Sequence, residues 1–250
     1  MRSGGCLSAW ACDARLLYPR ILEIRVDSRV TKLIFRTSNG ICVNHRRCLL
    51  EPIAEHQAAA NDLDLAANAM LSHDFKRCSE LLKRSDLRAL RQFSYKVSGP
   101  ISYEIHRQTR YPKFETAVNS DQFRMPGKAV QNEIFARDGW RCRYCGVRVI
   151  SKDARNTFRK YFPIEARKGP TNEDNHFGLA TLTASIDHVL PYKRGGTNDM
   201  NNLVTACGPC QFGKGHWTLD EIELEDPRNY PPVVDGWDGL SRLKIFRSHA

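Results

Sequence analysis

Four cysteines in the second half of the chain have the spacing of metal ligands, in the sequences Cys142-Arg143-Tyr144-Cys145 and Cys207-Gly208-Pro209-Cys210. Two residues between cysteines allow a tight turn to point both sulfurs at one ion, and two such turns complete a tetrahedral thiolate site. A site with four protein ligands is closed to water and is therefore structural. The spacing predicts a structural zinc site formed by Cys142, Cys145, Cys207 and Cys210.

Two other interpretations of the cysteine pairs stay open. A redox Cys-x-x-Cys motif usually starts a helix after a strand and needs no second copy. The chain has nine cysteines, so chance spacing is the other interpretation. The stretch between Cys145 and Cys207 is longer than the roughly 15 to 20 residues inside short zinc modules, which indicates that something substantial is held between the two turns.

An acid, a base and an amide follow one another between the cysteine pairs. Asp187 and His188 interrupt a short apolar stretch, and Asn202 ends the polar, glycine-containing loop that follows it. The Asp187 carboxylate can hold a hard divalent ion, and the His188 imidazole, near neutral at pH 7, can take a proton from an attacking water. Asn202 can fix the loop and orient His188 by an amide hydrogen bond. Neighbouring strand residues project to opposite faces, so a strand end or a bulge is needed to bring Asp187 and His188 to one site.

Basic residues accompany this segment. Lys214 and Arg194 can stabilise charge that grows on a phosphate, and Lys193 and Arg143 are further candidates for nucleic-acid contacts. The whole chain has 38 Lys and Arg against 28 Asp and Glu, a net charge of +10. Residues 124–215 hold 15 of these basic residues against 8 acidic ones, whereas residues 216–250 hold 4 against 7. This distribution favours an acidic partner, and nucleic acid comes first.

The order of these residues resembles that of a known family. The chain reads Cys-x-x-Cys, Asp-His-x-x-Pro, Gly-Gly, Asn-Leu and then Cys-x-x-Cys-x-x-x-Lys-Gly. This order is similar to that of the zinc-containing HNH endonucleases, and the resemblance runs from Arg124 to Pro227. It implies a ββα-metal fold and hydrolysis of phosphodiester bonds in nucleic acid, with double-stranded DNA as the expected substrate.

The resemblance also implies roles for particular residues. His188 is expected to be the general base that activates water, Asp187 a ligand of a catalytic Mg²⁺ or another divalent cation, and Asn202 the support of the active-site loop. The third motif position, His or Asn in the family, is Gln211 here. Gln has the carbonyl oxygen of Asn on a stem one methylene longer, so it can still reach a metal. Gln211 also leaves a second hypothesis open, a catalytically weakened, zinc-dependent DNA-binding module.

Hydrophobic patterning predicts the elements that position these residues. Val130, Ile134 and Phe135 share one helical face, and Asp138-Gly139 ends that helix. Strands are predicted within residues 184–191 and 203–206, with a short helix after the second. The expected fold class is α+β, with a ββα-metal nuclease domain and structural zinc at residues 124–250, including a C-terminal extension.

The insertion at residues 147–185 mixes basic and aromatic side chains. Contact with a nucleic-acid backbone and a solvated helix that covers the core are both open interpretations. His176, within a polar stretch of this insertion, is predicted to lie in a surface loop, with an extra metal or phosphate contact as the alternative.

Residues 1–123 are predicted to form a mixed, largely helical N-terminal region of unknown role. A hairpin is expected at residues 21–35 and helices are expected within residues 51–93. No stretch approaches the roughly 18 consecutive apolar residues of a membrane helix, so no membrane partner is expected. Asp13 and Arg15 interrupt the apolar start of the chain, which favours a cytoplasmic location with reduced thiols. The oligomeric state is not predicted.

Overall fold

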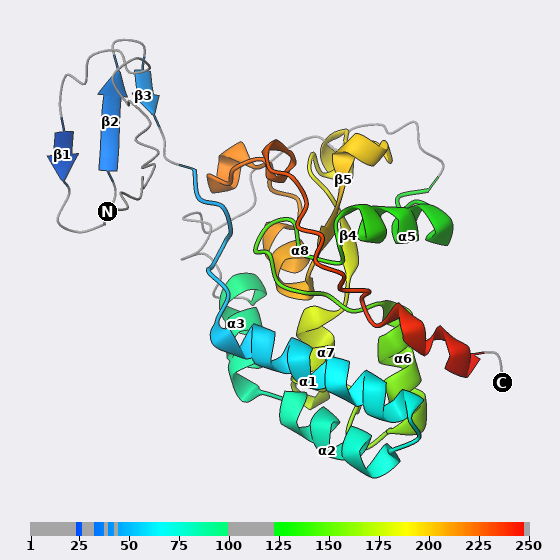
Figure 1. The fold of residues 1–250 in the computed structure, drawn as a ribbon. Helices are drawn as coiled ribbons and strands as arrows, with labels where there is room; N and C mark the ends of the chain where they lie inside the picture. The colour runs from blue at the N-terminus through cyan, green and yellow to red at the C-terminus, as the bar shows by residue number, and fades with distance from the viewer. Residues whose placement is uncertain (1–23, 27–32, 38–39, 43–44, 100–122, 248–250) are drawn as a thin grey trace, which may run out of the picture. The chain divides into compact units, whose positions relative to one another are not determined.

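The computed structural model describes residues 24–26, 33–37, 40–42, 45–99 and 123–247 (Figure 1). The chain divides into two compact units, residues 1–45 and residues 46–250. The first unit contains an antiparallel sheet of strands β1 (Ile24–Val26), β2 (Leu33–Thr37) and β3 (Gly40–Cys42), in that order. Strands β1 and β2 pair within the stretch where the hydrophobic alternation predicts a hairpin, and β3 adds a strand that the alternation does not predict.

Three helices open the second unit: α1 (Ala54–Leu71), α2 (Phe75–Ser85) and α3 (Arg88–Ser98). Helices α1 and α2 pack against each other, and Ala59 and Ala66 of α1 are completely buried. Alanine has no bulk beyond Cβ, so the two helices can approach closely and bury Leu81 and Leu82 of α2. Asp74 starts α2, because its carboxylate accepts a hydrogen bond from the backbone N–H of the third residue of that helix at 2.9 Å.

The next helices are α5 (Lys128–Arg137), α6 (Lys152–Tyr161) and α7 (Phe177–Leu182), with the short 3-10 helix η1 (Asn172–Asp174) before α7. Helix α5 ends at the predicted place, where Asp138 caps it and Gly139 takes a φ of +62°. Ser151 caps α6 by accepting a hydrogen bond from Ala154 N at 3.0 Å.

The prediction that His176 lies in a surface loop is wrong. His176 is completely buried and caps α7, where its Nδ1 accepts a hydrogen bond from Leu179 N at 3.0 Å. Its Nε2 lies 2.8 Å from Leu82 O of α2, and burial lowers the pKa of the imidazole. The residues just before His176 in the sequence are polar, so they give no indication that α2 covers this side chain.

Strands β4 (Ser185–His188) and β5 (Leu203–Ala206) form an antiparallel pair that aligns His188 with Leu203. The loop between them contains the 3-10 helices η2 (Tyr192–Arg194) and η3 (Met200–Asn202), and helix α8 (Gly208–Lys214) follows β5 directly. Figure 1 shows α8 beside this strand pair. The mixed helix-and-sheet class and the helical character before residue 100 are both confirmed.

Helix α3 packs against α7 and α8. The approach to α8 is close, because a Cβ on Gly213 would lie 2.7 Å from Val97 O of α3. Contacts group residues 46–250 into one compact unit. Whether the predicted division at residue 123 separates two functions stays a prediction.

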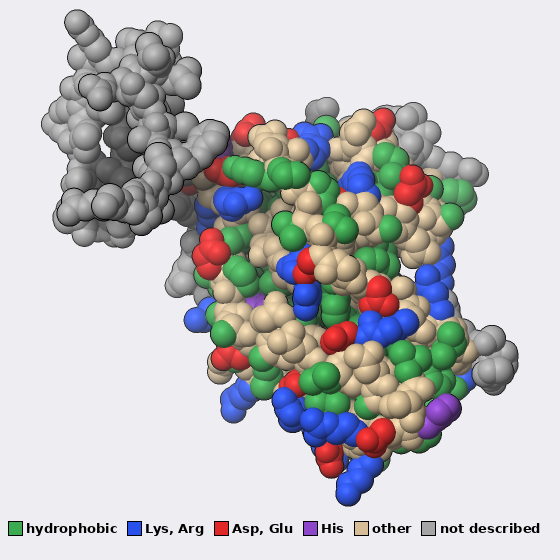
Figure 2. All heavy atoms as spheres, viewed as in Figure 1, with side chains coloured by type: hydrophobic (Ala, Val, Ile, Leu, Met, Phe, Trp, Pro, Cys, Tyr) green, Lys and Arg blue, Asp and Glu red, His purple; other side chains and the backbone are tan. Residues whose placement is uncertain are grey.

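The C-terminal segment runs through the 3-10 helices η4 (Asp220–Ile222), η5 (Pro227–Asn229) and η6 (Ser241–Arg247). Arg46 forms a parallel bridge with Leu224, so the first residue of the second unit contacts the C-terminal segment. On the face drawn in Figure 2, Lys and Arg side chains are interspersed with Asp and Glu, and they gather most visibly over α2. Among the helices of the described ranges, none combines the length and the apolar character needed to cross a membrane.

Candidate functional site

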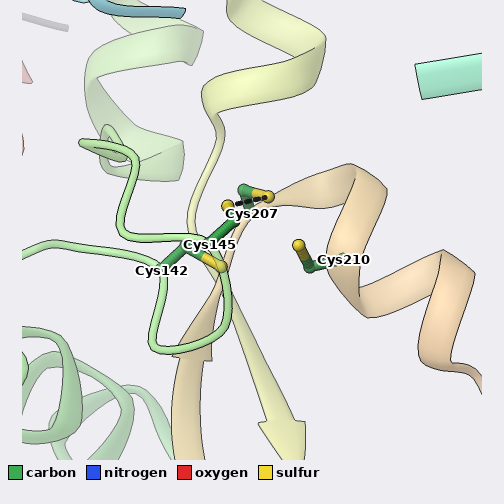
Figure 3. Close-up of side chains that lie close together, drawn as sticks. All are labelled: Cys142, Cys145, Cys207 and Cys210. Carbon is green, nitrogen blue, oxygen red and sulfur yellow. Dashed lines mark hydrogen bonds between the residues drawn. The ribbon is translucent and has the colours of Figure 1, made fainter. Parts of the chain in front are cut away.

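The structure brings the four predicted zinc ligands together (Figure 3). Cys142 and Cys145 lie on the turn after α5, Cys207 precedes α8, and Cys210 lies in the first turn of α8. Their sulfur atoms all lie within 4.8 Å of one another, and the Cys145 and Cys207 sulfurs are 3.7 Å apart. Sulfurs bound about 2.3 Å from a tetrahedral zinc lie about 3.8 Å apart, so the cluster has the dimensions of a four-thiolate metal site.

The backbone preforms the first cysteine turn. Cys142 N donates to Val147 O at 2.9 Å and Gly146 N donates to Cys142 O at 2.8 Å, with Gly146 at a φ of +76°. Burial raises the pKa of Cys142, but hydrogen bonds from the other three thiols of the cluster outweigh it and hold that pKa well below its ordinary value. Hydrogen bonds with the other thiols raise the pKa of Cys145 and of Cys210 well above their ordinary value, so these thiols would release their protons when a metal binds.

Asp138 connects this turn to the strand pair. Its side chain is almost fully buried, and Oδ2 accepts a hydrogen bond from Thr205 N of β5 at 2.7 Å. Oδ1 accepts a second bond from Arg137 Nε at 2.9 Å. Arg143 N donates to Thr205 O at 2.8 Å, so the cysteine turn and the end of α5 both hold β5 in place.

Arg143 is predicted to contact nucleic acid, but its guanidinium is directed into the protein. Nη2 donates to Pro227 O at 2.6 Å and also to Tyr230 O, and only 10% of the side chain is exposed. The residue therefore anchors the C-terminal segment to the first cysteine turn.

Asp187 of β4 is buried and has two partners. Its Oδ2 accepts a hydrogen bond from Tyr144 OH at 2.7 Å and lies 3.2 Å from Lys214 Nζ of α8. Burial, followed by the charge of Asp187, raises the pKa of Tyr144 well above its ordinary value, so the phenol remains a donor. Because Tyr144 stands between Cys142 and Cys145, the carboxylate is linked directly to the first cysteine turn.

Lys214 is completely buried in α8. Its ammonium donates to His188 O at 2.7 Å in addition to its ion pair with Asp187. The sequence predicts contact between Lys214 and a phosphate, but these two contacts favour a positioning role. The ammonium attaches α8 to the end of β4 and balances the buried carboxylate.

His188 ends β4 and is oriented by an asparagine of the following loop. Its Nε2 lies 3.0 Å from Asn198 Oδ1, and Asn198 Nδ2 donates to Phe123 O at 2.7 Å. That second bond sets the orientation of the amide, so its oxygen faces the imidazole and His188 must donate from Nε2. The lone pair then lies on Nδ1. Burial lowers the pKa of His188, so the ring is neutral at pH 7.

Asn202 makes its contacts within the loop rather than with His188. Its side chain accepts from Leu190 N at 2.9 Å and donates to Leu190 O at 3.1 Å and to Thr197 O at 2.9 Å. Gly196 fits against this amide only because it has no side chain, since a Cβ there would lie 1.8 Å from Leu190 O. The amide that orients His188 is that of Asn198, which sequence reasoning missed.

Gln211 lies on α8 beside β4. Its Nε2 donates to Ile186 O at 3.3 Å, one residue before Asp187. The side chain therefore reaches the strand that bears the acid and the base. The structure thus brings Asp187, His188, Lys214 and Gln211 together where α8 crosses the end of β4.

The remaining predicted residues lie on the loop after β4. Lys193 is exposed, whereas Arg194 Nη2 pairs with Glu221 Oε1 of the C-terminal segment at 2.9 Å. Two further basic residues, Arg124 and His216, lie near this loop, and the sequence pattern predicts no role for either. Burial, followed by the charges of Lys193, Arg124 and Lys214, lowers the pKa of the half-buried His216, and the charge of Asp187 acts in the opposite direction. The position of His216, two residues after the motif lysine, is the signal that could have pointed to it.

Comparison with known proteins agrees with this geometry. Residues 178–225 match a family model described as HNH endonuclease. The match covers β4, the loop, β5 and α8, but it begins after the first cysteine turn. No curated protein and no solved structure matches the chain. The resemblance noted in the sequence is confirmed: the chain carries an HNH endonuclease domain at residues 178–225, and the turn at Cys142–Cys145 completes a four-cysteine cluster of a kind that can hold a metal ion.

Proposed function

We propose that the protein is a metal-dependent HNH endonuclease that hydrolyses phosphodiester bonds in double-stranded DNA. One observation carries the proposal: the imidazole of His188 is fixed by Asn198 inside the HNH domain, on the strand that also bears Asp187. A general base for water attack must be unprotonated at working pH and fixed in direction. The hydrogen bond from His188 Nε2–H to Asn198 Oδ1 fixes the direction of the ring, and burial lowers the pKa of His188, which favours the unprotonated form.

His188 takes a proton from the attacking water through Nδ1, the ring nitrogen that carries the lone pair. Nε2–H stays bonded to Asn198 Oδ1, which also stabilises the imidazolium that forms. The base therefore keeps its orientation while its charge changes.

Asp187 and Gln211 are the residues that would hold the catalytic divalent ion. Both contacts of Asp187 fall on Oδ2, which leaves Oδ1 as a hard oxygen ligand, and the Gln211 amide oxygen is the second. A bound divalent ion supplies positive charge that stabilises the scissile phosphate and the departing 3′ oxygen. The ammonium of Lys214 competes for the same carboxylate, so we expect weak binding of magnesium or manganese.

We further propose that the four-cysteine cluster holds zinc and that this zinc is structural. The cluster has four protein thiolates, so a tetrahedral ion bound there has no position for water. Thiolates survive in a reducing compartment, which supports a cytoplasmic location.

The cations around His216 support nucleic acid as the substrate. After burial, the charges of Lys193 and Arg124 lower the pKa of His216, and both residues are exposed, whereas Lys214 is buried and paired with Asp187, so two accessible positive charges lie near this part of the domain. Accessible positive charges attract the phosphate backbone and accelerate its approach.

A plasmid-nicking assay tests the proposal. We expect the wild type to nick supercoiled DNA when magnesium or manganese is added. His188→Ala should lose about 10²- to 10⁴-fold in rate, the contribution of a general base. His45→Ala, which removes an exposed histidine outside the site, is the matched control and should retain full activity. Equal nicking by the wild type and His188→Ala would contradict the role of His188.

A catalytically weakened, zinc-dependent DNA-binding module is the second candidate. Two observations favour it: Gln211 replaces the family's His or Asn, and the Lys214 ammonium is paired with Asp187. This candidate predicts salt-sensitive binding of DNA without metal-stimulated nicking. Robust magnesium-dependent turnover in the same assay would exclude it.

A further inference from the structure

A pocket lies where α3 of the N-terminal region meets α7 and α8. Its volume is about 320 Å³, near the lower end of small-molecule sites, and it can take one flat ring system. The walls include Ser94 and Tyr95 of α3, Phe177 and Thr181 of α7, and Phe212 of α8. Three segments that are far apart in the sequence therefore build one concave site inside the unit of residues 46–250.

Two aromatic side chains of this pocket are exposed to solvent. Tyr95 is 45% exposed and Phe212 is 70% exposed, although Leu90, Phe93 and Val97 of α3 and Cys210 of α8 are buried. Exposed aromatic rings that meet at a pocket indicate a surface that binds something, and a flat partner can stack on them.

The outer face of α3 adds positive charge beside these rings. Arg88, Gln92, Tyr95 and Lys96 are exposed and follow one another at helical spacing, and they line an open hollow that shares Tyr95 with the pocket. Arg91 also lines both hollows, but it is paired with Glu173 of η1. Basic residues interleaved with an exposed aromatic ring suit a nucleic-acid strand, whose phosphates bind the cations while a base stacks on the ring.

Helix α8 links the pocket to the candidate active site. Gln211 reaches Ile186 O next to Asp187, and Phe212 is the following residue, about 100° further round the helix. Lys214, which contacts Asp187, lies two residues after Phe212 and therefore leaves α8 about 160° away from it, so a bound strand has to cross α8 to reach both places.

We propose that this pocket binds one unpaired base of the DNA substrate, stacked on Tyr95 and Phe212 across α8 from the active site. The inference rests on the proposed nuclease function and gives the helical N-terminal region a task, which is to build one wall of a base-binding site. It also implies that DNA with an unpaired segment binds more tightly than a fully paired duplex.

The test uses the full chain and a single-stranded DNA oligonucleotide that carries 2-aminopurine, whose fluorescence falls when the base stacks. We expect binding to quench this fluorescence. Tyr95→Ala and Phe212→Ala should each weaken binding by roughly 5- to 150-fold, the effect of losing one base–aromatic stack. Tyr95→Phe and Phe212→Tyr keep a ring and should keep binding. Tyr161→Ala, which removes a partly exposed ring on α6, is the matched control.

The outcomes separate this inference from the nuclease proposal. Wild-type protein that nicks plasmid DNA but leaves the 2-aminopurine signal unchanged would overturn the base pocket and leave the nuclease intact. Quenching without any nicking would support the pocket and overturn the nuclease. Equal quenching in the wild type and in Tyr95→Ala with Phe212→Ala would overturn the pocket. So would competition by adenosine monophosphate as strong as by the oligonucleotide, because that would assign the pocket to a free nucleotide.

Discussion

The four-cysteine cluster and the Asp187–His188 site are neighbours that differ in how their parts are held. All four sulfurs of the cluster come from two short turns, and each turn supplies two of them. In the second site each group depends on a partner from elsewhere, since Tyr144 holds Asp187 and Asn198 holds His188. Short-range spacing is therefore enough to gather the four cysteines, whereas the arrangement of Asp187 and His188 depends on contacts between separate segments.

Removing one cysteine of the cluster should have the largest effect. Cys207→Ser is expected to prevent stable folding of residues 124–215, because structural zinc contributes about 10–16 kcal/mol in small modules, as much as the whole stability of a typical domain. Thermal unfolding followed by circular dichroism, with zinc content measured on the same samples, checks this. Cys48→Ser is the control, because Cys48 is buried but lies outside the cluster. An unchanged melting temperature and zinc content in Cys207→Ser would show that the cluster is not a structural metal site.

Removing the amide that orients His188 should have a smaller effect and leave the fold intact. Asn198→Ala is expected to lower the nicking rate by about 10- to 100-fold, since outer partners that orient a reactive imidazole have effects of that size. The measurement is the nicking rate at saturating metal, with circular dichroism as the check on folding. Asn201→Ala, at an exposed asparagine of the same loop, should change neither. A rate equal to that of the wild type would mean that β4 alone orients the imidazole.

The exchange of Gln211 for the family's residue should have the smallest effect. Gln211→Asn shortens the side chain by one methylene, and we expect the magnesium concentration for half-maximal nicking to change by about tenfold. A lower magnesium concentration for half-maximal nicking in Gln211→Asn would mean that the longer glutamine side chain holds its amide away from the ion. A higher concentration would mean that the position of α8 suits glutamine. The control is Gln57→Asn at an exposed position of α1. No change at all would remove Gln211 from the metal site.

Sequence patterns predict this protein best where an element depends on residues that are close together in the chain. The end of α5 at Asp138, the strand before Pro191 and the helix after Cys207 all follow from short-range signals. The two cysteine turns were found for the same reason, because the ligands of each turn are only two residues apart.

The features that sequence reasoning missed depend on contacts between distant segments. His176 is polar in sequence and buried in the structure because α2 covers it. Arg143 carries a charge suited to DNA, yet the carbonyls of a segment more than eighty residues later accept its hydrogen bonds. Lys214 has the position of the family's lysine, but only packing of α8 against β4 reveals that its ammonium is enclosed. The partners of His176, Arg143 and Lys214 lie too far away in the sequence for a spacing pattern to predict them.

The hydrogen bonds around Thr205 also bear on self-association. An exposed strand edge is a template on which a second chain can add its own strand. At Thr205 that edge of β5 is already occupied, since Asp138 accepts the N–H and Arg143 donates to the carbonyl. The two-stranded sheet that carries Asp187 and His188 is thereby closed to edge-to-edge pairing at this residue, so the first cysteine turn also blocks the addition of a second chain's strand there.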